Sequence, residues 1–292
     1  MKYIKPSVEL IERGDFFSEV ALIAHNCYQV QTGKDDEGFI KRLIQAKHYA
    51  MIEHYRFAYK ISESLYFELV RLNNRFIELV ACQGAYFAST SLRVFLEMKD
   101  SGSIPEAVLK LVSNLDKPLQ SLLGLDLLAS DDALLLSEKE IDQLPITAYQ
   151  ILKYVTVRIV TDRGVTHELV RHRLCSFAQE STRYCNYSKN KFGNELTFIE
   201  PLDYSSNKDI YDEVFSKIEQ DYLLLTNKRN VAPEFARSIL PNKIKATIVV
   251  TANIDEWKNI FNLRLAAAAH PDMRQVMLLV LDEFNKNGLL KQ

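Results

Sequence analysis

Glycine is scarce in this sequence of 292 residues, which contains only nine. The closest two are Gly33 and Gly38, and Phe39 follows the second of them. Neither the GxGxxG fingerprint of dinucleotide-binding folds nor the GxxxxGK[ST] phosphate loop can therefore be written anywhere in the chain. If the protein binds a nucleotide, the phosphates must meet arginine, histidine, backbone amides and helix N-termini instead of a glycine-rich cradle.

Long apolar runs and a large net charge are also missing. The longest leucine-rich stretch is interrupted by Asp126, Asp131 and Asp132, so no run approaches the roughly 18 to 20 residues of a membrane span. Glu9 and Asp15 stand where a signal peptide needs an apolar core, so we expect a cytoplasmic protein without membrane contact. With 36 Lys+Arg against 38 Asp+Glu, no global positive field favours nucleic acid, and any anion site must be local.

Cysteine is sparse, since Cys27, Cys82, Cys175 and Cys185 are the only four. They form no CxxC pair and no cysteine–histidine spacing typical of metal ligands, so we expect neither a metal site nor a disulfide framework. We expect free thiols that pack as small apolar side chains. The remaining composition, with 47% hydrophobic and 25% charged residues, is typical of a globular protein.

Hydrophobic periodicity predicts several amphipathic helices. They span Phe17–Tyr28, Gly38–Ala46, Asn207–Thr226, a stretch from near Pro233 to before Pro241, Asp255–Ala269 and Pro271–Asn285. Strands are predicted for Phe57–Ile61, parts of Phe76–Ala81 and Tyr154–Val160, and Lys245–Thr251 is either a short strand or a buried helix. Because strands occur early and in mid-chain without regular βαβ alternation, the predicted class is α+β, with a mixed or antiparallel sheet and long helices.

The stretch Glu97–Gln143 differs in composition from the rest of the chain. It contains ten acidic and four basic residues, with leucine-rich helical periodicity and several glycine and proline breaks. This pattern predicts a small inserted helical subdomain, and a solvated acidic surface is the simplest interpretation of its charge.

A second stretch, Arg163–Ser188, concentrates cations among hydroxyl and amide side chains. On a helix, Arg171 and His172 would point in different directions, so that one segment could touch two ligands. The planar guanidiniums of Arg171 and Arg173 suit forked hydrogen bonding to phosphate oxygens, and Arg183 suits a second anion. Composition alone is equally typical of a solvated basic helix end.

The spacing of these residues resembles a known signature. Arg171-His172-Arg173, Ser181 and Arg183-Tyr184 are similar to the motif of the flavin-dependent thymidylate synthases, which methylate dUMP without a cysteine nucleophile. Three further elements resemble that family in the family's order: His48–His54 (HYAMIEH), Ala236–Pro241 (ARSILP) and Thr251–Arg264 (TANIDEWKNIFNLR). The resemblance covers roughly residues 15–60 and 150–285, and it implies one domain, 1–292, with an insertion at about 62–150 to which we assign no chemistry.

The resemblance implies a role for each matching residue. The residues implied to bind FAD are His48, Ala50, Glu53, Arg171, His172, Arg173, Leu174, Gln179, Asn253 and Asn259. The residues implied to bind dUMP are Glu168, Arg171, Gln179, Glu180, Ser181, Thr182, Arg183 and Arg237. Arg264 resembles the arginine at the uracil edge, where a cation stabilises negative charge as N3 ionises, and we expect it to be catalytic. The family also implies methylenetetrahydrofolate and NADPH as co-substrates and a homotetramer with active sites between subunits.

The chain departs from the family pattern at a few positions. Ala50 replaces a frequent Ser or Thr, Gln179 a frequent Glu, and Glu168 a frequent Gln. His25 also stands in a stretch where the family often has Arg and Ser. If the insertion or the changes at Ala50 and His25 disable flavin chemistry, the protein is a non-catalytic nucleotide-binding paralogue. A third function also stays open, a single-stranded nucleic-acid binder that stacks bases on Tyr184 and Tyr187 of the Arg/Tyr-rich segment.

Overall fold

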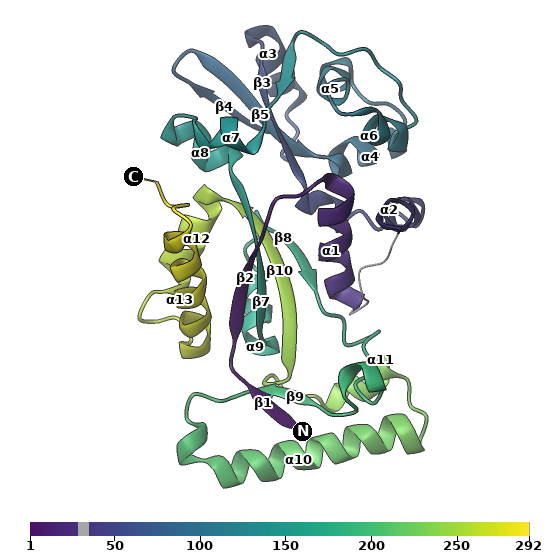
Figure 1. Ribbon diagram of the computed structural model, residues 1–292, viewed down its shortest axis with the longest axis vertical. Coiled ribbons are helices and arrows are strands. Elements are labelled where there is room, and N and C mark those ends of the chain that lie inside the picture. Colours follow the sequence, from purple (N-terminus) through teal and green to yellow (C-terminus); the bar gives the residue numbers. More distant parts are fainter. Residues whose placement is uncertain (29–34, 292) are drawn as a thin grey trace.

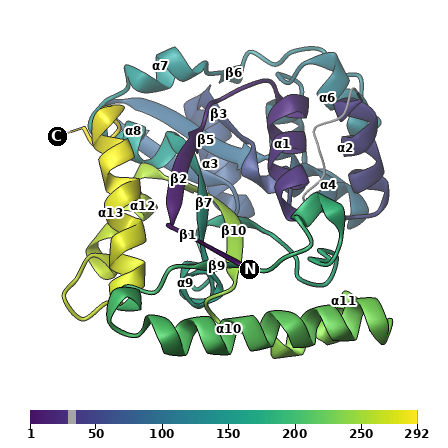
Figure 2. The same cartoon turned by 60° about the horizontal axis from the view of Figure 1, so that its bottom comes forward.

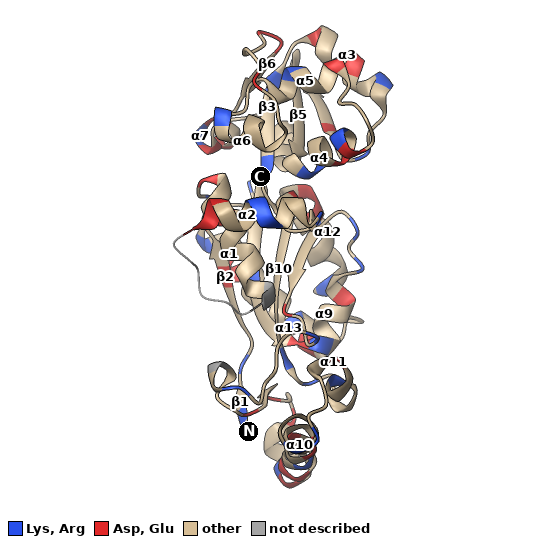
Figure 3. Ribbon diagram, turned by 90° about the vertical axis from the view of Figure 1, so that its right-hand side faces the viewer, with Lys and Arg blue, Asp and Glu red and all other residues tan. Residues whose placement is uncertain are grey.

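The computed structural model of the protein describes residues 1–28 and 35–291 and has an α+β fold, which confirms the predicted class. In this part of the chain, two four-stranded antiparallel sheets and a two-stranded parallel sheet follow one another along the longest axis (Figure 1). No helix within the described ranges is long and apolar enough to cross a membrane. Acidic and basic residues occur together on helices at both ends of the molecule (Figure 3).

The central sheet has the strand order β2-β7-β10-β8. Its strands are β2 (Ser7–Ile11), β7 (Tyr154–Asp162), β10 (Lys245–Asn253) and β8 (Ser176–Gln179). The inner strands β7 and β10 pair along their whole length, from Asn253 opposite Tyr154 to Lys245 opposite Asp162. Both are rich in β-branched residues, which pack well on a pleated surface buried on two sides. The strand predicted at Tyr154–Val160 is confirmed, and Lys245–Thr251 is a strand and not a helix.

Helices cover both faces of the central sheet (Figures 1 and 2). One face carries α1 (Phe16–Tyr28) and α2 (Asp36–Gln45), and the other carries α12 (Ile254–Arg264) and α13 (Pro271–Lys286). Trp257 is completely buried under α13, and its indole N–H donates to the carbonyl oxygen of Val155 at 3.0 Å. The helix predicted over Asp255–Ala269 ends five residues early, because the exposed alanines from Ala266 onward offer little apolar surface to bury.

The second sheet has the order β4-β5-β3-β6. Its strands are β3 (Arg56–Ile61), β4 (Glu78–Cys82), β5 (Ala85–Ser91) and β6 (Ala133–Leu135). The helices around it are α3 (Glu63–Leu72), α4 (Leu92–Asp100), α5 (Glu106–Val112), α6 (Lys117–Leu122) and α7 (Glu138–Asp142), while α8 (Ile146–Leu152) leads into β7.

The prediction of a helical subdomain at Glu97–Gln143 is therefore only partly right, because the stretch also contains β6 and packs on a sheet. The strand β5 was missed because it is buried on both faces and so lacks the alternation that marks a strand. It follows β4 through Gln83 and Gly84, whose φ angles of 51° and 76° suit a tight type I′ hairpin.

The third region holds the parallel pair and a long helix. Its elements are β1 (Lys2–Ile4), β9 (Thr197–Ile199), α10 (Lys208–Leu223) with a π-helical turn at Leu224–Lys228, and α11 (Pro233–Ala236). Phe198 stacks on Phe215 at 4.4 Å between ring centroids and joins the strand pair to α10. The helix predicted from Pro233 is shorter than expected, since α11 gives way to a 3-10 turn at Arg237–Ile239.

Candidate functional site

Arg264 is held by three hydrogen bonds at the C-terminal end of α12. Its Nε donates to Nε2 of His172 at 2.9 Å, and its two terminal nitrogens donate to the carboxylate and the backbone carbonyl of Glu168 at 2.9 and 3.0 Å. Glu168 belongs to α9 (Arg163–Leu169), and His172 lies in the turn that follows it. The fold therefore brings together three predicted site residues and orients the planar guanidinium.

The neighbours of His172 determine which ring nitrogen carries its proton. A guanidinium can only donate, so Nε2 accepts from Arg264, and Nδ1 carries the hydrogen that is donated to Oε1 of Glu256 at 3.3 Å. Burial, and then the positive charge of Arg264, lower the pKa of His172. His172 is therefore neutral at physiological pH and connects the Glu256 carboxylate to Arg264.

Glu256 is a site residue that the sequence-based prediction missed. Its side chain is buried, and its Oε2 accepts from Nδ2 of Asn259 at 3.2 Å. Its backbone N–H donates to Oδ1 of Asn253, the N-cap of α12, at 2.8 Å. The spacing of Asn253 and Glu256 is that of a helix cap followed by an acidic third residue, and this signal could have singled Glu256 out. Asn253 and Asn259 are thus joined to the Arg264 network.

A second group of predicted residues surrounds Arg237. Its guanidinium donates to the hydroxyl of Thr182 at 3.4 Å, which links the 3-10 turn after α11 to the loop after β8. Arg183 is half-exposed and lies 3.9 Å from the Glu234 carboxylate, and its backbone N–H donates to Oγ of Ser181. The fold therefore brings the segments of Arg183 and Arg237 together and leaves both side chains open to solvent, as an anion site requires.

Gln179 and Glu180 are occupied by contacts within the protein. Gln179 donates from Nε2 to the hydroxyl of Thr166 at 2.8 Å. Glu180 is 2% exposed, its Oε2 lies 2.6 Å from Nζ of Lys245, and its Oε1 accepts from the hydroxyl of Tyr187 at 3.0 Å. Tyr187 is itself buried, so it offers no surface for stacking on a base.

The helix expected around Arg171 is not present. The helix α9 ends at Leu169, and a turn leads to β8, whose Ser176 pairs with Thr251 of the central sheet. A continuing helix would carry the chain away from that sheet edge. The pairing of β8 with β10 therefore outweighs the local helix propensity of this segment. Arg171 nonetheless faces solvent while the next residue is buried, so the two point in different directions as expected.

A cavity of about 320 Å³ lies beside Arg173 and Leu174, between the two four-stranded sheets. Both side chains are exposed, Leu174 by 75%. Glu53 lines the same cavity and forms an ion pair with Arg93 of α4. Three of the residues implied to bind FAD therefore share one cavity.

His48 and Ala50 follow α2 and are exposed. Within residues 1–28 and 35–291, neither side chain forms a hydrogen bond or an ion pair with another candidate residue. Their role as flavin contacts stays a prediction.

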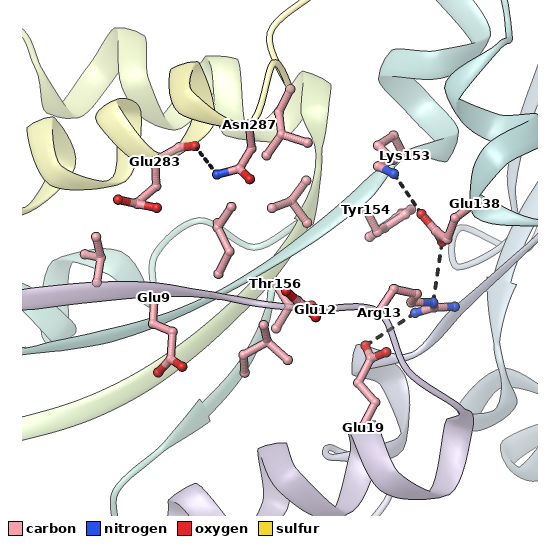
Figure 4. A pocket seen from close by; sticks show the side chains of 15 residues that line it. Glu9, Glu12, Arg13, Glu19, Glu138, Lys153, Tyr154, Thr156, Glu283 and Asn287 are labelled. Atoms are coloured by element: carbon pink, nitrogen blue, oxygen red, sulfur yellow. Dashed lines mark hydrogen bonds and ion pairs between the residues drawn. The ribbon is translucent and has the colours of Figure 1, made fainter.

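Another cavity, of about 520 Å³, lies beside β2 and the end of α13 (Figure 4). Its cations are already paired, Arg13 with Glu19 and Glu138, and Lys153 with Glu138. Its glutamates are Glu9, Glu12, Glu19, Glu138 and Glu283. The excess of carboxylates disfavours a phosphate-bearing ligand, and none of the predicted site residues lines this cavity.

Cys175, the cysteine of the Arg-rich turn, is not prepared as a thiolate for catalysis. Cys82, Cys175 and Cys185 are not in disulfides, as expected, and the side chain of Cys27 lies outside what the structure describes. Burial raises the pKa of Cys175, which lies beside the Arg-rich turn, so this thiol stays protonated at neutral pH. In the same described ranges, no three His, Cys, Asp or Glu side chains are placed to hold a metal ion.

Fold and site together define an α+β protein with arginines at three places in the candidate site. They are Arg264 at the end of α12, Arg183 with Arg237 near α11, and Arg173 at the cavity between the two sheets. Residues 152–287 match the family described as "Thymidylate synthase complementing protein". That range includes every predicted site residue except His48, Ala50 and Glu53. The comparison confirms, over this range, the resemblance to the flavin-dependent thymidylate synthase family.

Individual relatives match a stretch of similar length. The flavin-dependent thymidylate synthase of Pyrococcus abyssi is 34% identical over 127 residues, which are 43% of this chain and 51% of the relative. The enzyme of Pyrococcus furiosus is 35% identical over 41% of this chain and 49% of its own length. The enzyme of Saccharolobus solfataricus is 32% identical over 41% of this chain and 45% of its own length. The chain thus spans about half the length of the curated relatives it matches.

Among solved structures, thymidylate synthase X from Helicobacter pylori, determined with FAD and dUMP, is 19% identical. The similarity covers 48% of this chain and 74% of that one, with a TM-score of 0.38.

Proposed function

We propose that the protein is a flavin-dependent thymidylate synthase that converts dUMP to dTMP. Methylenetetrahydrofolate would provide the carbon, and NADPH would provide the hydride through FAD. The observation that carries the proposal is the oriented guanidinium of Arg264, held by Glu168 and neutral His172 within the range that matches the family.

Arg264 keeps donors for a substrate. A guanidinium has five N–H groups, and three are used, one in the bond to His172 and two in the bonds to Glu168. The two that remain are on the terminal nitrogens and suit the O2/N3 edge of a uracil ring. Arginine stays charged at any working pH, so it stabilises the negative charge that develops as N3 loses its proton and C5 becomes nucleophilic.

The other arginines suit the phosphates of the two nucleotides. Arg183 and Arg237, one near Glu234 and the other bound to Thr182, would hold the phosphate of dUMP. Exposed Arg173, with the apolar surface of Leu174 beside it, fits a ligand that is both anionic and aromatic, as FAD is. FAD, when bound, supplies the hydride chemistry, and the protein orients the reactants. A homotetramer with sites between subunits is part of the proposal and rests on the family resemblance.

The direct test is turnover by the purified full chain. We expect flavin absorbance, or uptake of added FAD, and dTMP formation that requires dUMP, methylenetetrahydrofolate and NADPH. Arg264→Ala should lower turnover by at least about 100-fold. Arg274→Ala, an exposed arginine on α13, should leave turnover unchanged.

A protein that takes up no FAD would refute the proposal. Binding of dUMP without any turnover would instead identify a non-catalytic paralogue, and steeply salt-dependent binding of oligonucleotides would identify a nucleic-acid binder. Retained turnover in the Arg264→Ala enzyme would contradict the role of that arginine. Light scattering of the same preparation tests the tetramer.

A further inference from the structure

The cavity beside Arg173 has two walls of different origin. One wall is the turn after α9 with the start of β8, which lies in the range that matches the family. The other wall includes Arg75 and Phe76, in the turn between α3 and β4, and Arg93 at the start of α4. Residues of the 62–150 segment therefore form part of the cavity lining, together with Glu53 and Arg56.

The positive charge of this cavity is concentrated on two arginines. Four arginines and three glutamates line it. Arg93 is paired with Glu53 and, at 2.7 Å, with Glu97, and the guanidinium of Arg56 lies 3.8 Å from Glu78. In contrast, neither Arg75 nor Arg173 forms an ion pair with a carboxylate of the described residues, although both line the same cavity.

Apolar surface adjoins these two cations. Phe76 is 46% exposed, Leu174 is 75% exposed, and the Arg75 guanidinium carbon lies 4.6 Å from the centroid of the Phe76 ring. Both apolar side chains line the cavity and are accessible to a ligand there. A cavity with two unneutralised guanidiniums and an exposed aromatic ring suits a ligand with a diphosphate and a planar heterocycle.

The structure assigns to the 62–150 segment one wall of the flavin site, where Arg75 contacts the diphosphate of FAD opposite Arg173 and Phe76 packs on a ring of the dinucleotide. This assignment rests on the proposed function. It gives a chemical role to a segment that lies outside the range that matches the family model.

The test is the affinity of the purified full chain for FAD, measured by the change in flavin fluorescence at two salt concentrations. Arg75→Ala should weaken FAD binding by about tenfold and reduce its salt dependence, whereas Arg75→Lys should retain most of the affinity. Phe76→Ala should weaken binding about fivefold. Two residues of α3 outside the cavity provide matched controls: Arg71→Ala, and Phe67→Ala, at a phenylalanine that is 47% exposed. Both should bind FAD like the wild type.

The inference is overturned if Arg75→Ala and Phe76→Ala bind FAD as tightly as the wild type, or if the two controls lose as much affinity. In that case the wild type still binds FAD, and the proposed function is unaffected. If the wild type itself binds no FAD, the proposed function and this inference fail together. Unchanged thermal unfolding midpoints of the four alanine variants show that any loss of affinity is not a loss of fold.

Discussion

Two kinds of charged side chain occupy the candidate site. Arg264 and Glu180 are closed, since partners from distant segments surround each of them. Arg173 and Arg183 are open, since they face solvent and have at most a distant carboxylate. Removing the partner of a closed charge strongly destabilises the fold, and that partner holds the charge in one orientation. An open charge is hydrated, so the fold is stable without a partner for it. The difference separates charges that the protein already holds in one orientation from charges that stay hydrated until a ligand binds.

The largest effect is expected from breaking the closed pair of Glu180. Lys245→Met leaves a carboxylate of 2% exposure without its cation, and the free energy of unfolding should fall by about 3 kcal/mol, measured by urea denaturation. The matched control is Lys117→Met, whose ion pair with Asp126 is exposed and which should change stability by less than about 0.5 kcal/mol. Equal losses in both variants would contradict the distinction.

A second effect concerns pH and the buried, uncharged histidine next to the sheet. His54 is completely buried, its Nδ1 lies 2.8 Å from the hydroxyl of Thr251, and burial lowers its pKa to about 4 from 6.5. Below pH 6.5 the His54 side chain binds a proton in the unfolded chain, but in the folded protein it stays neutral down to about pH 4. The free energy of unfolding therefore falls as the pH drops from about 6.5 to 4. The expected contribution is about 3 kcal/mol.

The check is urea denaturation across that pH range. His54→Gln cannot titrate and should flatten the profile, while His270→Gln, at an exposed histidine, should keep the wild-type slope. A His54→Gln profile as steep as the wild type would show that other groups cause the loss.

A smaller effect is expected at the open arginines of the proposed phosphate site. Arg237→Ala should raise the KM for dUMP about tenfold, because one charge-assisted hydrogen bond is lost. Steady-state kinetics measure the change, and Arg229→Ala, at another exposed arginine, serves as the control. If kcat falls while KM is unchanged, Arg237 does not bind the ground-state phosphate.

The smallest effect is expected on stability when an open charge, Arg173, is removed. Arg173→Ala should change the free energy of unfolding by less than about 0.5 kcal/mol, because the side chain is exposed at the cavity. Thermal or urea unfolding without ligand measures it. A loss above about 1 kcal/mol would mean that Arg173 is part of the protein's own framework.

Long periodic segments of the fold could be predicted from the sequence. Tyr154–Val160 and Pro271–Asn285 form a strand and a helix with nearly the expected bounds, because the pattern in each matches the face it buries. The strand β5 could not be predicted, since a strand buried on both faces loses its alternation. The turn at Arg171 could not be predicted either, because the pairing of β8 with β10 decides where α9 must end.

The arginines and asparagines of the candidate site could be predicted because their spacing resembles a family motif. Partners outside the motif could not be predicted in the same way. Lys245 neutralises Glu180 from a strand far along the chain, and Arg75 reaches the cavity from a segment without a recognisable pattern. Glu256 lies between two motif residues and is the exception, since the capping pattern marks it.

The sequence by itself determined where most helices and strands form, because their hydrophobic periodicity depends on neighbours along the chain. It also fixed the type and order of the chemically important side chains. Only the tertiary structure decided which of these charges are closed and which are open. Burial and pairing depend on contacts between residues such as His172 and Arg264, which are 92 positions apart, and no local pattern records such a distance.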